Sequence, residues 1–213
     1  MNRYLAACNN DTRKAMTLYR KNLKLSQELF TVISCFEVAL RNAIDSHYTA
    51  IYGNQWLADF AQANGLFDIN QTRQSKEAIN ETIAKLRNQY THPKLVSELG
   101  FGFWRYLFGR HQYRIAGRTL INIFPNLPAT TPLINYNANF IFNELEKVNT
   151  IRNRIAHHDP ICFRRGHQEI STNFAKSRYD LIIRLFNWMN ISELDLLYGL
   201  DNVEKVIIEI NNI

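Results

Sequence analysis

Residues 29–44, LFTVISCFEVALRNAI, form the stretch that decides the fold of this chain. Apolar side chains occur on nearly every side when the stretch is drawn as a helix, which is typical of a central, buried helix. Upstream, residues 10–12 offer N-caps for a helix that begins near Arg13. We expect this helix to continue, with a break near Leu23–Ser26, to Tyr52 and to end at Gly53.

The rest of the chain also reads as helical segments separated by short breaks. Five prolines and eight glycines are few, and most fall between these segments. No internal repeat or clear linker occurs, so we expect an all-α fold in one domain over residues 1–213. The expected helices are Gln71–Tyr90, Pro93–Phe108 with a break around Gly100 and Gly102, His111–Phe124, Tyr136–His158, Ser177–Met189 and Val203–Ile210.

Composition narrows the class of protein. An apolar content of 46% excludes global disorder. Three widely spaced cysteines support neither a disulfide framework nor a zinc site. Residues 1–8 lack the apolar core of a signal peptide, and no apolar run is long enough to span a membrane. A reducing, cytoplasmic setting without a metal or other cofactor is the expectation.

The net charge of +6 is unevenly distributed. Basic side chains dominate residues 1–25 and 105–118, whereas the tail from residue 191 is acidic. Basic blocks suggest a polyanionic partner such as nucleic acid, and ordinary solvated helix surface is the alternative. In the second block, the candidates for contact with RNA are Arg105, Arg110, Arg114 and Arg118. Trp104, Tyr106 and Tyr113 are candidates for stacking on bases, and core packing is the alternative for these aromatics.

Residues 152–160, RNRIAHHDP, carry the side chains most suited to chemistry. Arginine is a permanent cation that suits phosphate, and histidine moves protons near neutral pH. On a helix, Asn153 and His157 lie one turn apart, opposite an apolar stripe, and Arg152 lies at the edge of that stripe. The alternative is a polar last turn, in which cations favour the C-terminal end of the helix.

A second polar group, Glu37, Arg41 and Asn42, interrupts the apolar stretch. A carboxylate and a guanidinium there are costly unless paired. They form either an ion pair that reaches the surface or a support that orients the Arg152–His157 site.

Four segments in order resemble the Abi family of abortive-infection proteins, which belongs to the HEPN superfamily. These segments are FEVALRN (36–42), FGFWRYLF (101–108), IFPN (123–126) and IRNRIAHHDPI (151–161). The resemblance implies a HEPN-like helical bundle with additional helices and, in many relatives, a metal-independent endoribonuclease that works as a dimer.

The resemblance also implies residue roles. Arg152, Asn153 and His157 fall on the catalytic positions of the superfamily, with His158 as an alternative because the spacer varies. Glu37 and Arg41 fall on its other polar pair. We therefore expect an endoribonuclease that acts as a toxin-like effector in phage defence, with RNA as substrate, a homodimer as the assembly and an antitoxin of protein or RNA as a further partner. A non-catalytic module that binds RNA or protein is the alternative.

Overall fold

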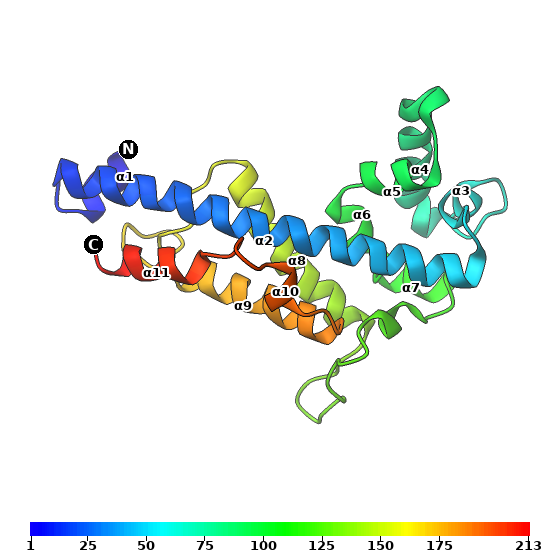
Figure 1. Cartoon of the computed structure of the whole chain (residues 1–213). Coiled ribbons are helices and arrows are strands. Elements are labelled where there is room, and N and C mark those ends of the chain that lie inside the picture. The colour runs from blue at the N-terminus through cyan, green and yellow to red at the C-terminus, as the bar shows by residue number, and fades with distance from the viewer. The chain divides into compact units, whose positions relative to one another are not determined.

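The computed structural model describes residues 1–213, and its regular secondary structure is helical (Figure 1). It contains eleven α-helices and three short 3-10 helices, and its only β feature is an isolated bridge between Phe163 and Ile170. The expected all-α class is confirmed. None of the helices combines the length and the apolar character that crossing a membrane requires.

The long helix α2, Thr12–Tyr52, begins where the sequence predicts. The Asp11 carboxylate accepts hydrogen bonds from the backbone N–H groups of Arg13 and Lys14, at 2.9 and 3.0 Å. The predicted break near Leu23–Ser26 is absent: the helix contains no proline or glycine, and Leu25 there is fully buried. The helix ends before Gly53, which takes a positive φ of 89°.

Within the fold-deciding stretch, burial follows one face of α2. The exposed fractions of Phe30 and Val38 are 42% and 43%, so the helix is not buried on all sides. The contiguous apolar run in the sequence therefore predicts more burial than this part of α2 has. The side chains that reach the core are Leu29, Val32, Ile33, Phe36, Leu40 and Ile44.

The chain forms two compact units, and α2 and α8 (Ala138–Ala156) contribute to both. The first unit comprises residues 1–36 and 147–213, and the second comprises residues 37–146. The expectation of one domain over 1–213 stays a prediction.

The first unit contains α1 (Asn2–Ala7), the beginning of α2, the end of α8, α9 (Asn173–Trp188), α10 (Glu193–Leu196) and α11 (Val203–Asn211). Helix α11 lies beside α9 (Figure 1). Lys21 of α2 pairs with Glu209 of α11 at 2.7 Å, and Asn202 donates to Glu28. The acidic tail thus offsets part of the basic N-terminal block within this unit.

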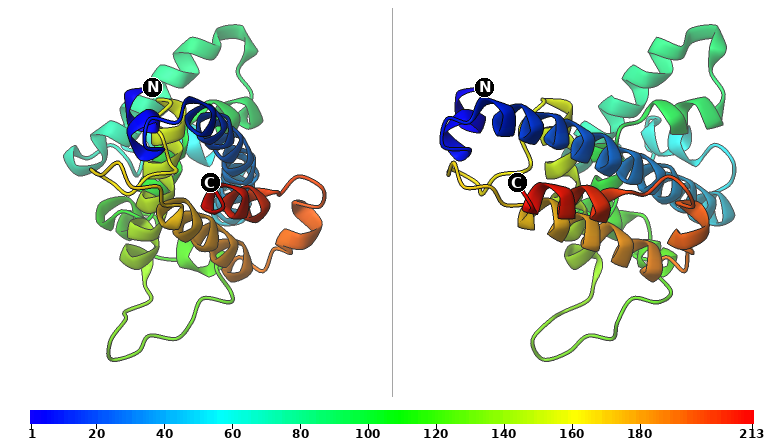
Figure 2. Two further views of the ribbon diagram at one scale, coloured as in Figure 1. Left: turned by 90° about the vertical axis from the view of Figure 1, so that its left-hand side faces the viewer. Right: turned by 60° about the vertical axis from the view of Figure 1, so that its left-hand side comes forward.

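The second unit contains the end of α2, the beginning of α8 and five short helices between them. An aromatic cluster that includes Tyr48 and Trp56 fills its core. Residues 124–137 form a long loop that projects away from the helices (Figure 2). The short helices are α3 (Trp56–Ala61), α4 (Arg73–Leu86), α5 (His92–Glu98), α6 (Phe101–Tyr106) and α7 (Arg110–Ile115).

Two helix predictions in the second unit had different outcomes. The break expected within Pro93–Phe108 is confirmed, because α5 ends at Glu98 and α6 begins at Phe101. The continuous helix expected over His111–Phe124 is wrong. Helix α7 stops at Ile115 because Gly117 and Arg118 both take positive φ, and only a short 3-10 helix follows at Leu120–Ile123.

Candidate active site

The RNRIAHHDP segment comprises the last turn of α8, which ends at Ala156, and the four residues that follow it, all in the first unit. The helix ends in a Schellman motif: the N–H of Asp159 bonds to the carbonyl of Arg154 at 2.8 Å, and the N–H of His158 bonds to that of Ile155 at 3.0 Å. His158 takes the left-handed conformation that this motif requires, with φ 58°, and Pro160 follows. The backbone of His158 therefore has a structural task that the sequence alone did not assign.

Asn153 and His157 lie on one exposed face of this helix end. The N–H of His157 donates to the carbonyl of Asn153 at 2.9 Å, so the two residues are one turn apart as predicted. Both side chains are exposed, as is His158, whereas Arg152 is half-buried. The imidazole and the amide are therefore accessible to a large substrate, and the arginine adjoins them in sequence.

Contacts within the first unit hold the loop that follows the helix. The side-chain oxygen of Asn22, which is 3% exposed, accepts from the N–H groups of Ile161 and Cys162 at 2.9 and 3.2 Å. Arg154 donates to the carbonyl of Pro160 at 2.6 Å. Asn22 thus positions the end of the motif from far away in the sequence, and no sequence signal could have revealed it.

Arginines gather around the same loop. Arg3 of α1 donates to the carbonyls of Arg164 and His167, at 3.0 and 2.5 Å. Burial lowers the pKa of Arg154, Asp159 opposes this effect, and the nearby charges of Arg165 and Arg3 add to it. Glu169 pairs with Arg164 at 3.2 Å, whereas Arg3 and Arg154 bond to carbonyl oxygens, which do not neutralise charge, so the region keeps an excess of cations. Sequence reasoning selected Arg152 from the motif and missed Arg154 and the arginines around it.

The second predicted polar group lies in the second unit, on α2. Glu37 and Arg41 are half-buried, and Asn42 is exposed. Arg41 donates to the carbonyl of Ser97 at 3.4 Å, a long contact that ties α2 to α5. The orienting role expected of these three residues stays a prediction.

The four arginines expected to contact RNA differ in their surroundings. Arg105 pairs with Glu146 and packs over the ring of Phe142 at 4.2 Å, with its side chain 11% exposed. The other three line one cavity in the second unit, with a volume of 480 Å³. Trp104 is fully buried and donates to the carbonyl of Leu99, as a core residue does. The structure therefore groups Arg110, Arg114 and Arg118 and places Arg105 in an ion pair.

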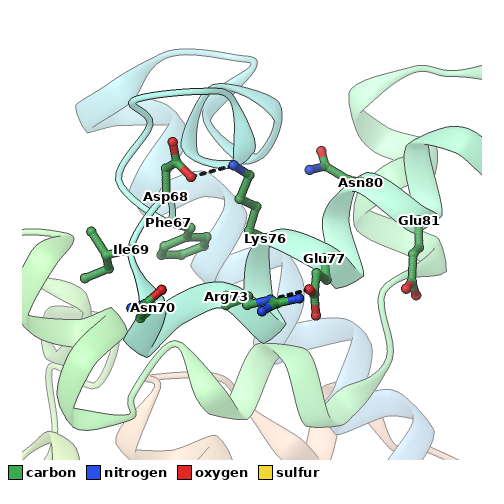
Figure 3. A pocket seen from close by; sticks show the side chains of 9 residues that line it. All are labelled: Phe67, Asp68, Ile69, Asn70, Arg73, Lys76, Glu77, Asn80 and Glu81. Atoms are coloured by element: carbon green, nitrogen blue, oxygen red, sulfur yellow. Dashed lines mark hydrogen bonds and ion pairs between the residues drawn. The ribbon is translucent and has the colours of Figure 1, made fainter.

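A separate pocket of 640 Å³ in the second unit lies between the residues that precede α4 and α4 itself (Figure 3). Its two cations are both paired, Lys76 with Asp68 and Arg73 with Glu77, each at 2.6 Å. Glu81 also lines this pocket, so acids outnumber cations there, and the pocket offers no free excess of positive charge. The chain gathers no group of three His, Cys, Asp or Glu side chains that could hold a metal ion.

These observations define the class of protein: an all-α chain with an exposed asparagine and an exposed histidine at the end of α8. The Abi-like protein family matches residues 2–162, which include both α2 and the whole of α8. The chain belongs to the Abi-like family. Comparisons with curated proteins and with solved structures each found no match.

Proposed function

We propose that this protein is a metal-independent endoribonuclease that acts as a toxin-like effector in abortive infection. The observation that carries the proposal is the exposed pair of Asn153 and His157, one helical turn apart and adjoined by Arg152, in a chain of the Abi-like family. Abortive infection is the role that the family suggests, and RNA cleavage is the chemistry that these side chains would support.

The proposed reaction is an internal transesterification. His157 takes the proton of the RNA 2′-hydroxyl, the 2′ oxygen forms a bond to phosphorus, and the bond from phosphorus to the 5′ oxygen breaks. The 5′ oxygen receives a proton from a second histidine, which a second copy of this chain would supply. The products carry a 2′,3′-cyclic phosphate and a 5′-hydroxyl.

The neighbouring side chains support this step. Arg152 would stabilise the negative charge that develops on the phosphoryl oxygens, because its guanidinium presents fixed donors to phosphate. Asn153 would orient the imidazole of His157 or bind a phosphate oxygen. The nucleophile belongs to the RNA itself, so the protein need supply only proton transfer and charge stabilisation.

Cleavage of a labelled single-stranded RNA in excess EDTA tests the proposal. General acid–base catalysis contributes about 10²–10⁴-fold, so His157→Ala should reduce cutting by that order and abolish it in a gel assay. Arg152→Ala should also abolish detectable cutting. Mass spectrometry of the products should show the cyclic phosphate, and circular dichroism should show that both variants keep the parent's helical content.

His158→Ala is the matched control at the adjacent exposed histidine. If it abolishes cutting while His157→Ala does not, the acting histidine is His158 and the mechanism stands. If the parent protein binds RNA without cutting it, or if both histidine variants cut like the parent, the nuclease proposal fails. The non-catalytic binding module then replaces it.

A further inference from the structure

We propose that the cavity between α7 and the beginning of α8 binds an internal phosphate of single-stranded RNA and so anchors the substrate. This inference rests on the proposed function and adds a binding site in the second unit to it. The cavity, of 480 Å³, lies within the range of pockets that hold small ligands, and one nucleotide of a longer strand fits that size. Its lining residues are Phe108, Arg110, Tyr113, Arg114, Arg118, Asn137, Ala138 and Asn139.

The charge of the cavity selects the class of ligand. Three arginines line it, all three exposed, and no acidic side chain is among the lining residues. The pocket near α4 is different, because Asp68 and Glu77 pair with its cations. A concave site with three guanidinium groups and no acid favours an anion, and guanidinium geometry matches phosphate.

Arg118 is held at the cavity by backbone geometry that a non-glycine residue rarely adopts. Its φ is 60°, and it follows Gly117 with φ 82°. The Arg118 N–H donates to the carbonyl of Tyr113 at 2.9 Å, and the Tyr113 hydroxyl donates to the carbonyl of Arg118 at 2.5 Å. One hydrogen bond in each direction between Tyr113 and the backbone of Arg118 therefore fixes the position of Arg118 in this uncommon conformation.

The tyrosine hydroxyl keeps its proton for this contact. Burial raises the pKa of Tyr113, whereas the Arg118 charge and a backbone hydrogen bond from Ile121 lower it. The net shift is upward, so the hydroxyl stays protonated and remains a donor to Arg118 over a wide pH range.

The N-terminal end of α8 supplies further donors. The side-chain oxygen of Asn137 accepts from the N–H of Phe140 at 2.9 Å and so caps the helix. The first N–H groups of a helix have no partner within it, and here they belong to Ala138 and Asn139, which line the cavity. The positive end of the 19-residue helix dipole adds to the arginine charges.

Equilibrium binding of a fluorescent single-stranded RNA, measured by anisotropy over a range of salt concentrations, tests the proposal. His157→Ala is the background, so that the RNA stays intact. Arg118→Gly removes the side chain while glycine keeps the positive φ without strain. We expect affinity to fall about tenfold or more, and the slope of log K against log salt to become shallower by about 0.7, the value for one lost phosphate contact on a single strand.

Arg87→Gly is the matched control. Arg87 is also an exposed arginine of the second unit with positive φ, 48°, and it does not line this cavity. Its replacement should leave affinity and slope unchanged. Arg114→Ala, within α7, should repeat the effect of Arg118→Gly at a position without special backbone geometry.

Parent-like affinity and slope in both Arg118→Gly and Arg114→Ala would overturn the proposal, as would an equal loss in Arg87→Gly. An RNA with a 5′-hydroxyl should bind as tightly as one with a 5′-phosphate, and a requirement for the terminal phosphate would overturn the assignment to an internal one. This assay measures binding alone, so its result does not depend on whether the protein cuts RNA. A parent that binds through the cavity but never cuts would therefore defeat the nuclease proposal alone.

Discussion

His158 shows how one residue can serve the fold beside a residue proposed for catalysis. Its φ of 58° ends α8 and directs the chain toward Pro160. The left-handed conformation is costly for a side-chain-bearing residue and nearly free for glycine. The neighbouring His157, whose N–H completes the last helical turn, carries no such constraint.

We expect His158→Gly to raise the free energy of unfolding by about 1 kcal/mol or less, because it relieves the cost of positive φ. His158→Val should lower it, because a branched side chain tolerates this conformation poorly. Urea denaturation followed by circular dichroism measures both. Equal stability of the two variants would show that the backbone at this position is not constrained as described.

The pH dependence of stability has a predicted contribution from His47. Burial lowers the pKa of His47, whose Nε2 lies 2.9 Å from the Thr119 hydroxyl oxygen. The unfolded chain, with a histidine pKa of about 6.5, then binds the proton more readily than the folded protein does. This contribution to stability is complete above about pH 6.5 and is lost as pH falls through the lower, folded-state pKa.

His47→Gln should therefore show a smaller fall in Tm between about pH 7.5 and 5 than the parent, since glutamine can still bond to Thr119 without titrating. Differential scanning calorimetry at a series of pH values measures the difference. Parallel curves for the two proteins would contradict the expectation.

At the scale of elements, the loop after α8 depends on α2 through one amide. Asn22 accepts from two backbone N–H groups that lie 139 and 140 residues further along the chain. A buried donor left without a partner costs about 1–3 kcal/mol. The end of the proposed catalytic segment is thus stabilised by a helix that contributes none of its proposed catalytic residues.

Asn22→Ala should lower the free energy of unfolding by about 2–4 kcal/mol, because two buried N–H groups lose their acceptor. It should also slow RNA cleavage by loosening the segment that follows His157. Leu23→Ala is the adjacent control, since Leu23 is 45% exposed and should tolerate truncation. If both variants unfold at the same urea concentration, the two hydrogen bonds do not matter as described.

For the whole molecule, the proposed chemistry predicts a homodimer whose interface or shared cleft includes the Arg152–His157 turn. One chain offers a single copy of the motif, whereas the transesterification uses both a proton acceptor and a proton donor. A twofold arrangement would bring two copies of each side chain together. Light scattering at working concentration should give about twice the mass of the 25.0 kDa chain. A monomer, with and without RNA, would contradict this prediction.

Local patterns in the sequence determined most of the helices and the character of the proposed catalytic turn. Helical periodicity, the Asp11 cap and Gly53 predicted the ends of α2, and the spacing of Asn153 and His157 placed them on one face, because these effects act over a few residues. The three short helices α1, α3 and α10 carried too little periodic pattern to be predicted.

Only the tertiary structure decided the features that depend on distant contacts. It paired Arg105 with Glu146 and grouped the other three arginines around a cavity. It also brought the side-chain amide of Asn22 into hydrogen-bonding contact with the loop after α8. It also exposed Phe30 and Val38 on a helix whose sequence predicts burial on all sides. Burial and charge pairing arise between segments far apart in the chain, and a local pattern cannot specify which segments meet.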